Sequence, residues 1–187
     1  MAERKFWMRW RVRVGYPVAI FFWLLASPTP RAILVGAIVA AVGLAIRAWA
    51  AGYLRKDREL ATTGPYARTR NPLYLGSAIL AAGFVIAGAS IWGGALAGAY
   101  FAIFYYAVMR NEEEDLRKRF GAPFDEYARR VPLFFPSLGS GERVGSANGG
   151  FSWAQYRHNR EYKALIGSAL GIGILLARMF IRHRFGY

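Results

Sequence analysis

Apolar residues occur in this chain as runs long enough to cross a membrane, separated by short polar segments. Residues 31–53 form one such run, and residues 73–109 are almost wholly apolar. One crossing needs about 20 residues, so the longer run predicts two helices joined near residues 88–90. Shorter apolar runs at 14–26 and 164–177 predict two further helices. The expected fold is an all-α, polytopic integral membrane bundle of about five transmembrane helices.

The polar segments between these runs suggest how the chain is organised. We expect one membrane domain over 1–187, with two spans in 1–53, a core in 54–136, and a loop and helix in 137–187. Residues 137–150 are rich in glycine and serine, which predicts a flexible loop. The charged stretch 110–130 predicts a surface helix that is interrupted at residues 121–123, where glycine and proline occur together.

Small residues spaced four apart predict close contacts between helices. Such pairs occur at Gly94 and Gly98, and again at Gly167 and Gly171. In a membrane, small side chains let two helix backbones approach closely. We therefore expect helix contacts at these two pairs.

One charged residue, Arg47, interrupts the apolar run 31–53. An arginine at this depth is costly unless its side chain reaches the headgroups or faces a polar cavity. Snorkelling to the interface and contact with a substrate both remain open.

The composition supports a membrane protein and indicates its orientation. The chain is 55% hydrophobic and has a formal net charge of +14. The basic residues gather at the ends of the apolar runs, where they would meet anionic lipid headgroups, so we expect a bilayer and not a nucleic acid as partner. The positive-inside rule places the N-terminus, the 54–71 loop and residues 110–163 in the cytoplasm. A last helix that crosses fully would then leave the basic residues from Arg178 onward outside.

The side-chain inventory narrows the possible chemistry. The sequence has no cysteine, which excludes disulfides and thiolate sites. Its two histidines, His158 and His183, lie far apart in sequence, so we expect no metal site.

Two dense polar segments, 62–76 and 110–136, flank the long apolar run. If that run is a helical hairpin, both segments lie at its open end, on the same side of the membrane. The second segment contains three consecutive acids, Glu112 to Glu114. Acids favour the start of a solvated helix, but they also suit a cationic or hydroxyl-rich ligand, and both interpretations stay open.

The polar segments share a motif pattern with a known group of membrane enzymes. The pattern reads Arg70-Asn71-Pro72-x-Tyr74-x-Gly76 and then, after the apolar hairpin, Glu112-Glu113-x-x-Leu116-x-x-x-Phe120-Gly121-x-x-Phe124-x-x-Tyr127. Over residues 60–136 the chain resembles the isoprenylcysteine carboxyl methyltransferase and phospholipid methyltransferase superfamily. The carboxyl methyltransferases usually have histidine in place of Asn71, and Phe124 replaces a usual tyrosine. The form with asparagine is closer to the phosphatidylethanolamine methyltransferases.

This resemblance implies S-adenosylmethionine as cofactor. Glu112 and Glu113 would hold its amino group or its ribose hydroxyls through charge-assisted hydrogen bonds. The other cofactor-binding residues implied by the resemblance are Tyr66, Asn71, Pro72, Tyr74 and Gly76. Arg70 would meet the cofactor's carboxylate or an acidic substrate, and the candidates for a catalytic role are Arg70, Tyr74 and Tyr127. Pro72 and Gly76 also fit the simpler role of residues that start a helix.

The implied reaction is methyl transfer to a lipid or other lipophilic acceptor at a site facing the cytoplasm. A phospholipid amine such as phosphatidylethanolamine is the first expectation, because of Asn71, and a prenylcysteine carboxylate is the second. Two alternatives stay open. One is an NADPH-dependent membrane reductase similar to the steroid reductases, which carry a related Arg-His-Pro-x-Tyr-x-Gly motif, and the other is a non-catalytic membrane scaffold. The double glutamate favours methyl transfer over reduction.

Overall fold

The structure, a computed structural model, describes residues 2–55, 59–137 and 150–185. The long helices are α1 (Ala2–Leu25), α2 (Pro30–Tyr53), α3 (Pro72–Gly88), α4 (Ile91–Phe120) and α7 (Tyr162–Phe185). The short ones are η1 (Gly64–Ala67), α5 (Ala122–Arg130) and α6 (Trp153–His158). No strand occurs in the described ranges, so the predicted all-α class is confirmed. The predicted glycine-rich loop lies almost wholly outside the described residues.

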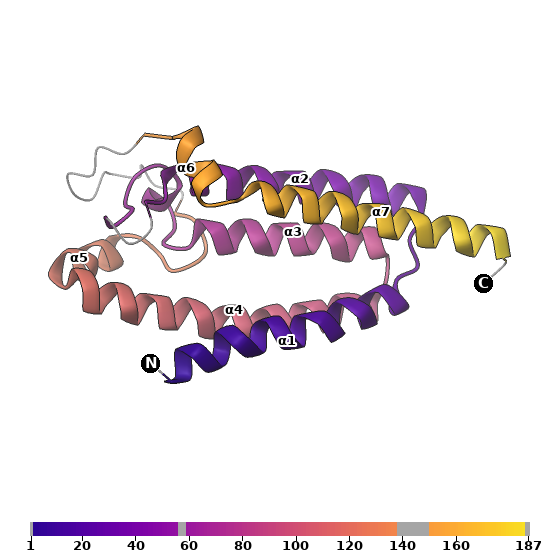
Figure 1. Cartoon of the computed structure of the whole chain (residues 1–187), viewed down its shortest axis with the longest axis horizontal. Helices are drawn as coiled ribbons and strands as arrows, with labels where there is room; N and C mark the ends of the chain where they lie inside the picture. Colours follow the sequence, from indigo (N-terminus) through magenta and orange to yellow (C-terminus); the bar gives the residue numbers. More distant parts are fainter. Residues whose placement is uncertain (1, 56–58, 138–149, 186–187) are drawn as a thin grey trace.

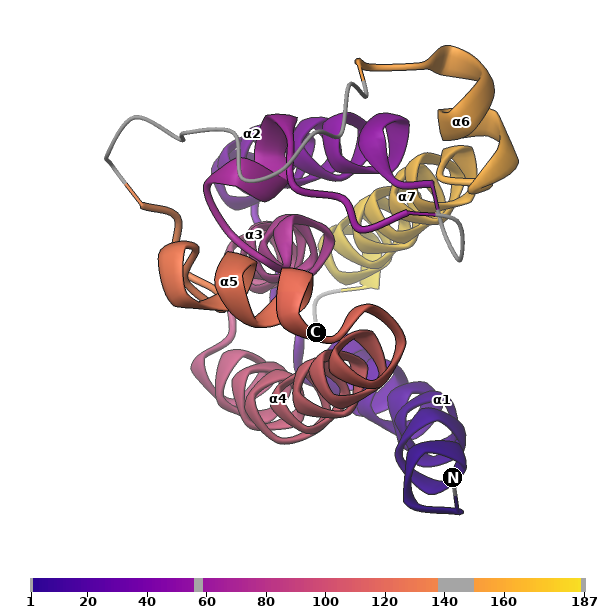
Figure 2. The same cartoon turned by 90° about the vertical axis from the view of Figure 1, so that its left-hand side faces the viewer.

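The long helices form two layers that run side by side. Helices α2, α3 and α7 make one layer, and α1 and α4 make the other (Figure 1). Seen end-on, α3 lies between α2, α7 and α4 (Figure 2). Successive long helices run in opposite directions, so the N-terminus, the segment after α2 and the end of α4 share one end of the bundle. The C-terminus lies at the other end.

Three of these helices, α2, α4 and α7, are long and apolar enough to cross a membrane. Two more apolar helices are shorter: Val12–Leu25 within α1, and α3. The structure therefore agrees with the predicted helical membrane bundle. The apolar part of α1 and the whole of α3 are shorter than the length required of a candidate span.

The closest helix contact joins α2 to α3, and glycine permits it. A Cβ added to Gly43 would lie 2.7 Å from the carbonyl oxygen of Gly76, and one added to Gly83 would lie 2.5 Å from the backbone nitrogen of Ala40. Gly36 meets the carbonyl of Gly83 in the same way. The two backbones thus touch directly. The contact explains why both helices carry glycines seven residues apart, a spacing that returns to nearly the same helix face.

The helix contacts predicted from small residues spaced four apart are only partly correct. Nothing lies within 4 Å of a Cβ added to Gly98 or Gly167. Gly94 and Gly171 each meet one neighbouring side chain. The spacing alone therefore did not show which of the small residues face another helix.

The turn between α3 and α4 is where the sequence predicts it. Ala89 has a left-handed backbone with φ 45°, and Ser90 caps α4 by accepting a hydrogen bond from the Gly93 backbone N–H at 3.2 Å. This cap compensates an otherwise unpaired donor at the start of the helix. The predicted apolar hairpin is therefore confirmed.

The acidic segment, in contrast, does not form a helix of its own. We expected a surface helix to begin at residue 110, but α4 continues without interruption from the apolar span to Phe120. Gly121 follows the helix with a φ of 57°, which suits glycine, and α5 begins at the next residue. The acids are therefore carried on the rigid extension of a membrane helix.

The basic tail contacts the opposite end of the bundle. Arg178 donates through Nε to the Ala26 carbonyl at 2.7 Å and through Nη2 to the Leu24 carbonyl at 2.6 Å. Arg182 donates to Ser27 Oγ at 2.6 Å. A cation at the end of α1 satisfies carbonyls that have no partner within the helix and complements its dipole. These two arginines attach α7 to α1.

We predict that Gly83→Ala lowers the melting temperature of the detergent-purified protein. The new Cβ would press on the backbone of α2, and such overpacking typically costs about 1–3 kcal/mol. Gly98→Ala is the matched control, since it also places alanine in a helix but in open space. Alanine favours helices over glycine by up to about 1 kcal/mol, so this control should be neutral or slightly stabilising. Equal melting temperatures for the two variants would contradict the glycine contact.

Candidate functional site

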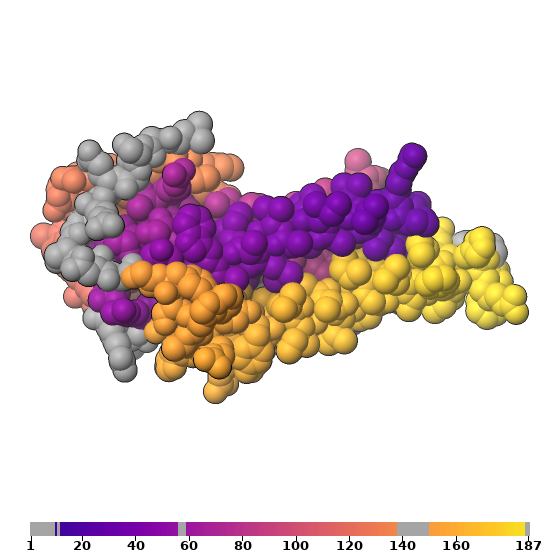
Figure 3. Space-filling view, turned by 90° about the horizontal axis from the view of Figure 1, so that it is seen from above, coloured from indigo at the N-terminus to yellow at the C-terminus, as the bar shows by residue number. Residues whose placement is uncertain are grey.

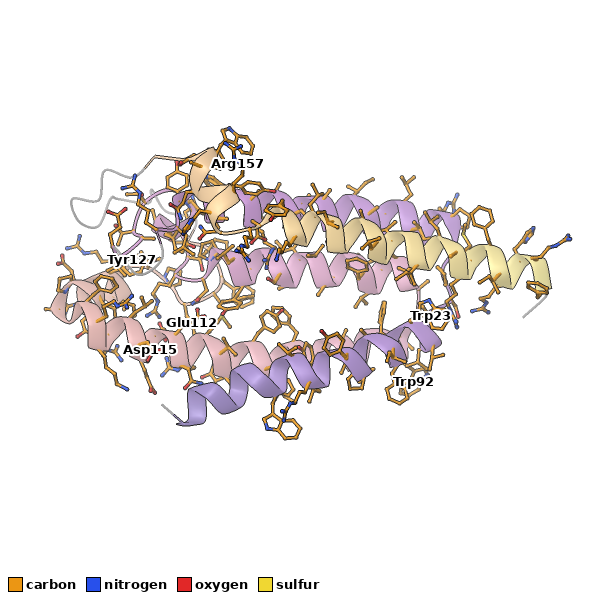
Figure 4. The ribbon with its side chains drawn as sticks, viewed as in Figure 1. Trp23, Trp92, Glu112, Asp115, Tyr127 and Arg157 are labelled. Carbon is orange, nitrogen blue, oxygen red and sulfur yellow. The ribbon has the colours of Figure 1, made fainter. Side chains whose placement is uncertain are left out.

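The two polar segments meet at the end of the bundle that holds the N-terminus, as the hairpin predicted. The Arg70 backbone N–H donates to the Pro132 carbonyl at 2.9 Å, and the Ser137 N–H donates to the Arg68 carbonyl at 2.9 Å. Glu112 and Tyr127 lie at this end, opposite Trp23 and Trp92 (Figure 4). Segments far apart in sequence are thus joined along their backbones.

Two side chains reinforce this connection. Thr69 donates through Oγ1 to the Phe134 carbonyl at 2.9 Å, and Asn71 donates through Nδ2 to the Leu133 carbonyl at 3.0 Å. Asn71 is buried and directly precedes Pro72, the first residue of α3. Its amide therefore fixes the segment 131–136 beside α3.

The two glutamates predicted to bind cofactor have different partners. They are consecutive on α4, so their side chains point in different directions around the helix. Glu112 accepts a hydrogen bond from the Tyr74 hydroxyl at 2.7 Å. Glu113 is only 6% exposed and pairs with Arg70, and also with Arg110 at 2.8 Å. A buried carboxylate requires such compensation.

Arg70 has a donor atom that makes no hydrogen bond with the described residues. Arg70 Nε is buried and has no hydrogen-bond partner among the described residues. The Thr62 hydroxyl is in the same situation. Buried polar atoms normally have a partner, so each exception requires an explanation, such as a water, an ion or a catalytic role. A guanidinium and carboxylates placed side by side can bind a ligand that carries both a carboxylate and an amino group.

An aromatic surface leads from the carboxylates toward the apolar part of α4. Tyr74 packs edge-on against Tyr105 with ring centroids 5.5 Å apart, and Phe101 stacks on Tyr105 at 4.0 Å. Tyr74 thus has its hydroxyl on Glu112 and its ring against an apolar neighbour. The polar site and the membrane-spanning region meet at this residue.

Tyr127, a predicted catalytic residue, occupies a different environment. Its side chain is 2% exposed and lies in an apolar cluster with Phe124 and Val131. Its hydroxyl donates to the Tyr66 carbonyl at 2.8 Å. Burial raises the pKa of the Tyr127 phenol, Arg70 opposes this effect and Glu113 adds to it. The geometry indicates an anchor that holds η1 against α5.

The Tyr66 side chain is buried close to the carboxylates. Burial raises the pKa of the Tyr66 phenol, and Tyr127, Glu112 and Glu161 raise it further. The phenol therefore stays protonated at neutral pH and can donate a hydrogen bond. This placement is compatible with the predicted role of Tyr66 in lining a pocket.

Pro72 and Gly76 face the interior of the protein. Pro72 is fully buried at the start of α3. Gly76 lies against α2, where an added Cβ would meet Arg47 Cγ at 2.7 Å and the Gly43 carbonyl at 2.8 Å. At Gly76, which the resemblance implied as a cofactor-binding residue, the close neighbour in the structure is therefore helix α2.

The structure shows that the charge of Arg47 is compensated inside the protein. Arg47 Nε pairs with Glu161 Oε1 at 2.5 Å, and Nη1 donates to Ser77 Oγ and to the Leu73 carbonyl at 3.5 Å. A charged residue within an apolar run indicates that a residue of opposite charge lies nearby, and Arg47 was such a residue. Glu161 was missed because it lies in the C-terminal region, beyond the recognised motifs.

Comparison with known proteins identifies the part of the chain that carries this site. The phospholipid methyltransferase family model matches residues 30–123, from α2 to the start of α5. The matched range contains Arg70, Tyr74, Glu112 and Glu113 and excludes Glu161. No solved structure matches the chain.

Two curated proteins are similar in sequence. The nickel-cobalt-cadmium resistance protein NccN of Alcaligenes xylosoxydans xylosoxydans is 42% identical over 107 residues, which are 56% of this chain and 48% of that protein. The cobalt-zinc-cadmium resistance protein CzcN of Cupriavidus metallidurans is 34% identical over 136 residues, which are 69% of this chain and 62% of that protein. The chain thus spans about half of the first relative and about three fifths of the second.

We predict that Tyr127→Phe lowers stability. Loss of the hydroxyl leaves the Tyr66 carbonyl without its partner, which typically costs about 1–3 kcal/mol for a buried group. Thermal unfolding of the purified protein would measure the effect. Tyr106→Phe is the matched control because Tyr106 is exposed on α4. A variant at Tyr127 that melts like the wild type would refute the anchoring role.

Proposed function

This chain belongs to the phospholipid methyltransferase family, and we propose that it is a membrane enzyme that transfers a methyl group from S-adenosylmethionine to a lipid or other lipophilic acceptor. The observation that carries the proposal is the paired arrangement of Arg70 with Glu113 and of Tyr74 with Glu112. All four residues lie within the matched range. The arrangement brings ionic groups and an aromatic surface together at one end of a membrane bundle.

The residues present fit the cofactor that the family implies. S-adenosylmethionine carries an amino group, a carboxylate, ribose hydroxyls and a sulfonium, and when bound it supplies an activated methyl group. Glu112 and Glu113 offer acceptors for the amino group or the hydroxyls, while Arg70 Nε is a buried donor without a partner among the described residues. Arg70 would therefore hold the carboxylate. Its present pairing with Glu113 keeps both charges compensated.

The contacts of Tyr74 suggest how the chain would manage the acceptor. An ammonium acceptor must lose a proton before its nitrogen can form a bond to carbon. The Tyr74 hydroxyl and the Glu112 carboxylate, joined by a hydrogen bond of 2.7 Å, can accept and hold that proton. The protein's remaining contribution is to align the reacting groups, which can supply several kcal/mol.

We propose a phospholipid amine such as phosphatidylethanolamine as the acceptor, with a prenylcysteine carboxylate as the second candidate. The Tyr74 hydroxyl contacts the Glu112 carboxylate, and the Tyr74 ring packs against Tyr105. Aromatic faces and carboxylates both attract cations, and methylation of an amine yields a cation. The family match and Asn71 support the same choice. A carboxylate acceptor would be repelled by Glu112 unless Arg70 compensated its charge.

We also propose that the site faces the cytoplasm. Among the described residues, most basic residues in loops and at helix ends lie at this end of the bundle (Figure 1), as the positive-inside rule requires of a cytoplasmic side. Arg178 and Arg182 lie at the other end and depart from this rule, but they hydrogen-bond to the end of α1. Their charges therefore have a structural partner.

The names of NccN and CzcN associate those proteins with resistance to metal ions. They specify no methyl acceptor. A contribution of this chain to metal resistance would, under our proposal, act through the membrane component that it methylates.

We expect detergent-purified protein to bind S-adenosylmethionine, and Glu113→Gln to weaken binding at least tenfold, or about 1.4 kcal/mol. The variant removes the carboxylate charge that compensates Arg70. Isothermal calorimetry measures both affinities. Glu114→Gln, on an exposed neighbour, is the control and should bind normally. Binding of NADPH in place of S-adenosylmethionine would indicate a reductase, and binding of neither would indicate a scaffold without catalysis.

Tyr74→Phe should lower the turnover number. Removal of a group that handles a proton typically costs about 10²–10⁴-fold in rate. The measurement is transfer of labelled methyl groups to vesicles that contain phosphatidylethanolamine, with vesicles of phosphatidylcholine alone as the acceptor control. Tyr106→Phe controls for loss of a hydroxyl from the same bundle. Undiminished turnover in Tyr74→Phe would remove the residue from the reaction.

A further inference from the structure

The C-terminal region contributes a charged side chain to the neighbourhood of the site. Glu161, which directly precedes α7, pairs with Arg47 of α2 at 2.5 Å, although 114 residues separate them in sequence. Their side chains are only 11% and 22% exposed. Charges so far removed from water require their partner, so this pair constrains where both residues lie.

The guanidinium of Arg47 extends this constraint to α3. Its Nη1 donates to Ser77 Oγ and to the Leu73 carbonyl, and Ser77 Oγ itself donates to that carbonyl at 2.8 Å. Gly76 makes room for the arginine stem, because an added Cβ would lie 2.7 Å from Arg47 Cγ. Arg47 therefore contacts the first turns of α3 at Leu73 and Ser77, and Leu73 directly precedes Tyr74 in the chain.

Glu161 is held in place by the residues that precede it. Asn159 Nδ2 donates to the carbonyls of Ala51 at 2.8 Å and Leu54 at 2.9 Å, which belong to the end of α2. The Ser152 backbone N–H donates to the Gly52 carbonyl at 3.0 Å. The space-filling view shows this region against α2, with α7 continuing along the same helix (Figure 3). Residues 151–161 thus cap α2 and aim Glu161 at Arg47.

We propose that the Arg47–Glu161 ion pair is a positioning element that fixes the first turn of α3, and with it the contact of Tyr74 with Glu112. This inference rests on the proposed methyl transfer. It gives the C-terminal region, which the family match does not include, a part in organising the site. Arg47 and Glu161 act through Tyr74 and do not touch the reacting groups.

The test compares two attachments of the same helix. Glu161→Gln removes the charge at the site end of α7, whereas Arg178→Gln removes one of the two arginines that attach its far end. Hydrogen exchange measured by mass spectrometry over residues 71–77 reports on the first turn of α3 without requiring activity. We expect Glu161→Gln to speed this exchange and to lower the turnover number at least about tenfold, with little change in the KM for S-adenosylmethionine.

Arg178→Gln should leave the exchange of 71–77 and the turnover number near wild-type values, since it acts at a distant site. If Glu161→Gln fails to fold, Arg47→Lys serves instead: it retains a charge toward Glu161 but loses the guanidinium contacts to Leu73 and Ser77, and the same changes are expected. Unchanged exchange and turnover, or an equal loss in Arg178→Gln, would overturn the proposal. Faster exchange in a protein whose wild type methylates no acceptor would support the positioning role and refute the proposed function.

Discussion

Direct backbone contact between α2 and α3 sets the position of everything at the polar end of this protein. Gly36 and Gly43 lie against Gly83 and Gly76 so closely that a single added carbon would collide with the backbone opposite. Lipid is as apolar as the helix surfaces, so hydrophobicity alone would not hold two such helices in one register, whereas close packing through small residues does. The register places Arg47 across the first turn of α3, where motif residues and membrane helix meet.

Charge compensation is the second constraint, and it follows from the first. The bundle brings several ionic groups to a partly dry region, where an unpaired charge is costly. Arg70 and Arg110 compensate Glu113, and Glu161 compensates Arg47. Among the residues that the structure describes, Glu112 has a hydroxyl partner instead of a cation. A charged ligand would enter a site whose groups are already aligned, and it would gain binding energy by sharing partners that exist before it arrives.

Helix α7 shows how a region outside the family match is integrated into the fold. At one end the residues before it cap α2, and at the other Arg178 and Arg182 bind the end of α1. Both attachments satisfy helix-end carbonyls, which have no partner within their own helices. The helix therefore connects the two layers of the bundle across its length.

The sequence by itself determined the all-α membrane class, the hairpin turn at residues 88–90 and the meeting of segments 62–76 and 110–136. These features depend on the lengths of the apolar runs, the turn residues and the direction of the chain, and all of these follow from the order of the residues alone. The structure alone decided that Gly76 faces a helix, that the Asn71 amide and the Tyr127 hydroxyl bind backbone carbonyls, and that Arg47 pairs with Glu161. Each of these depends on the rotation and depth of one helix relative to another, and contacts between residues far apart in sequence set those quantities.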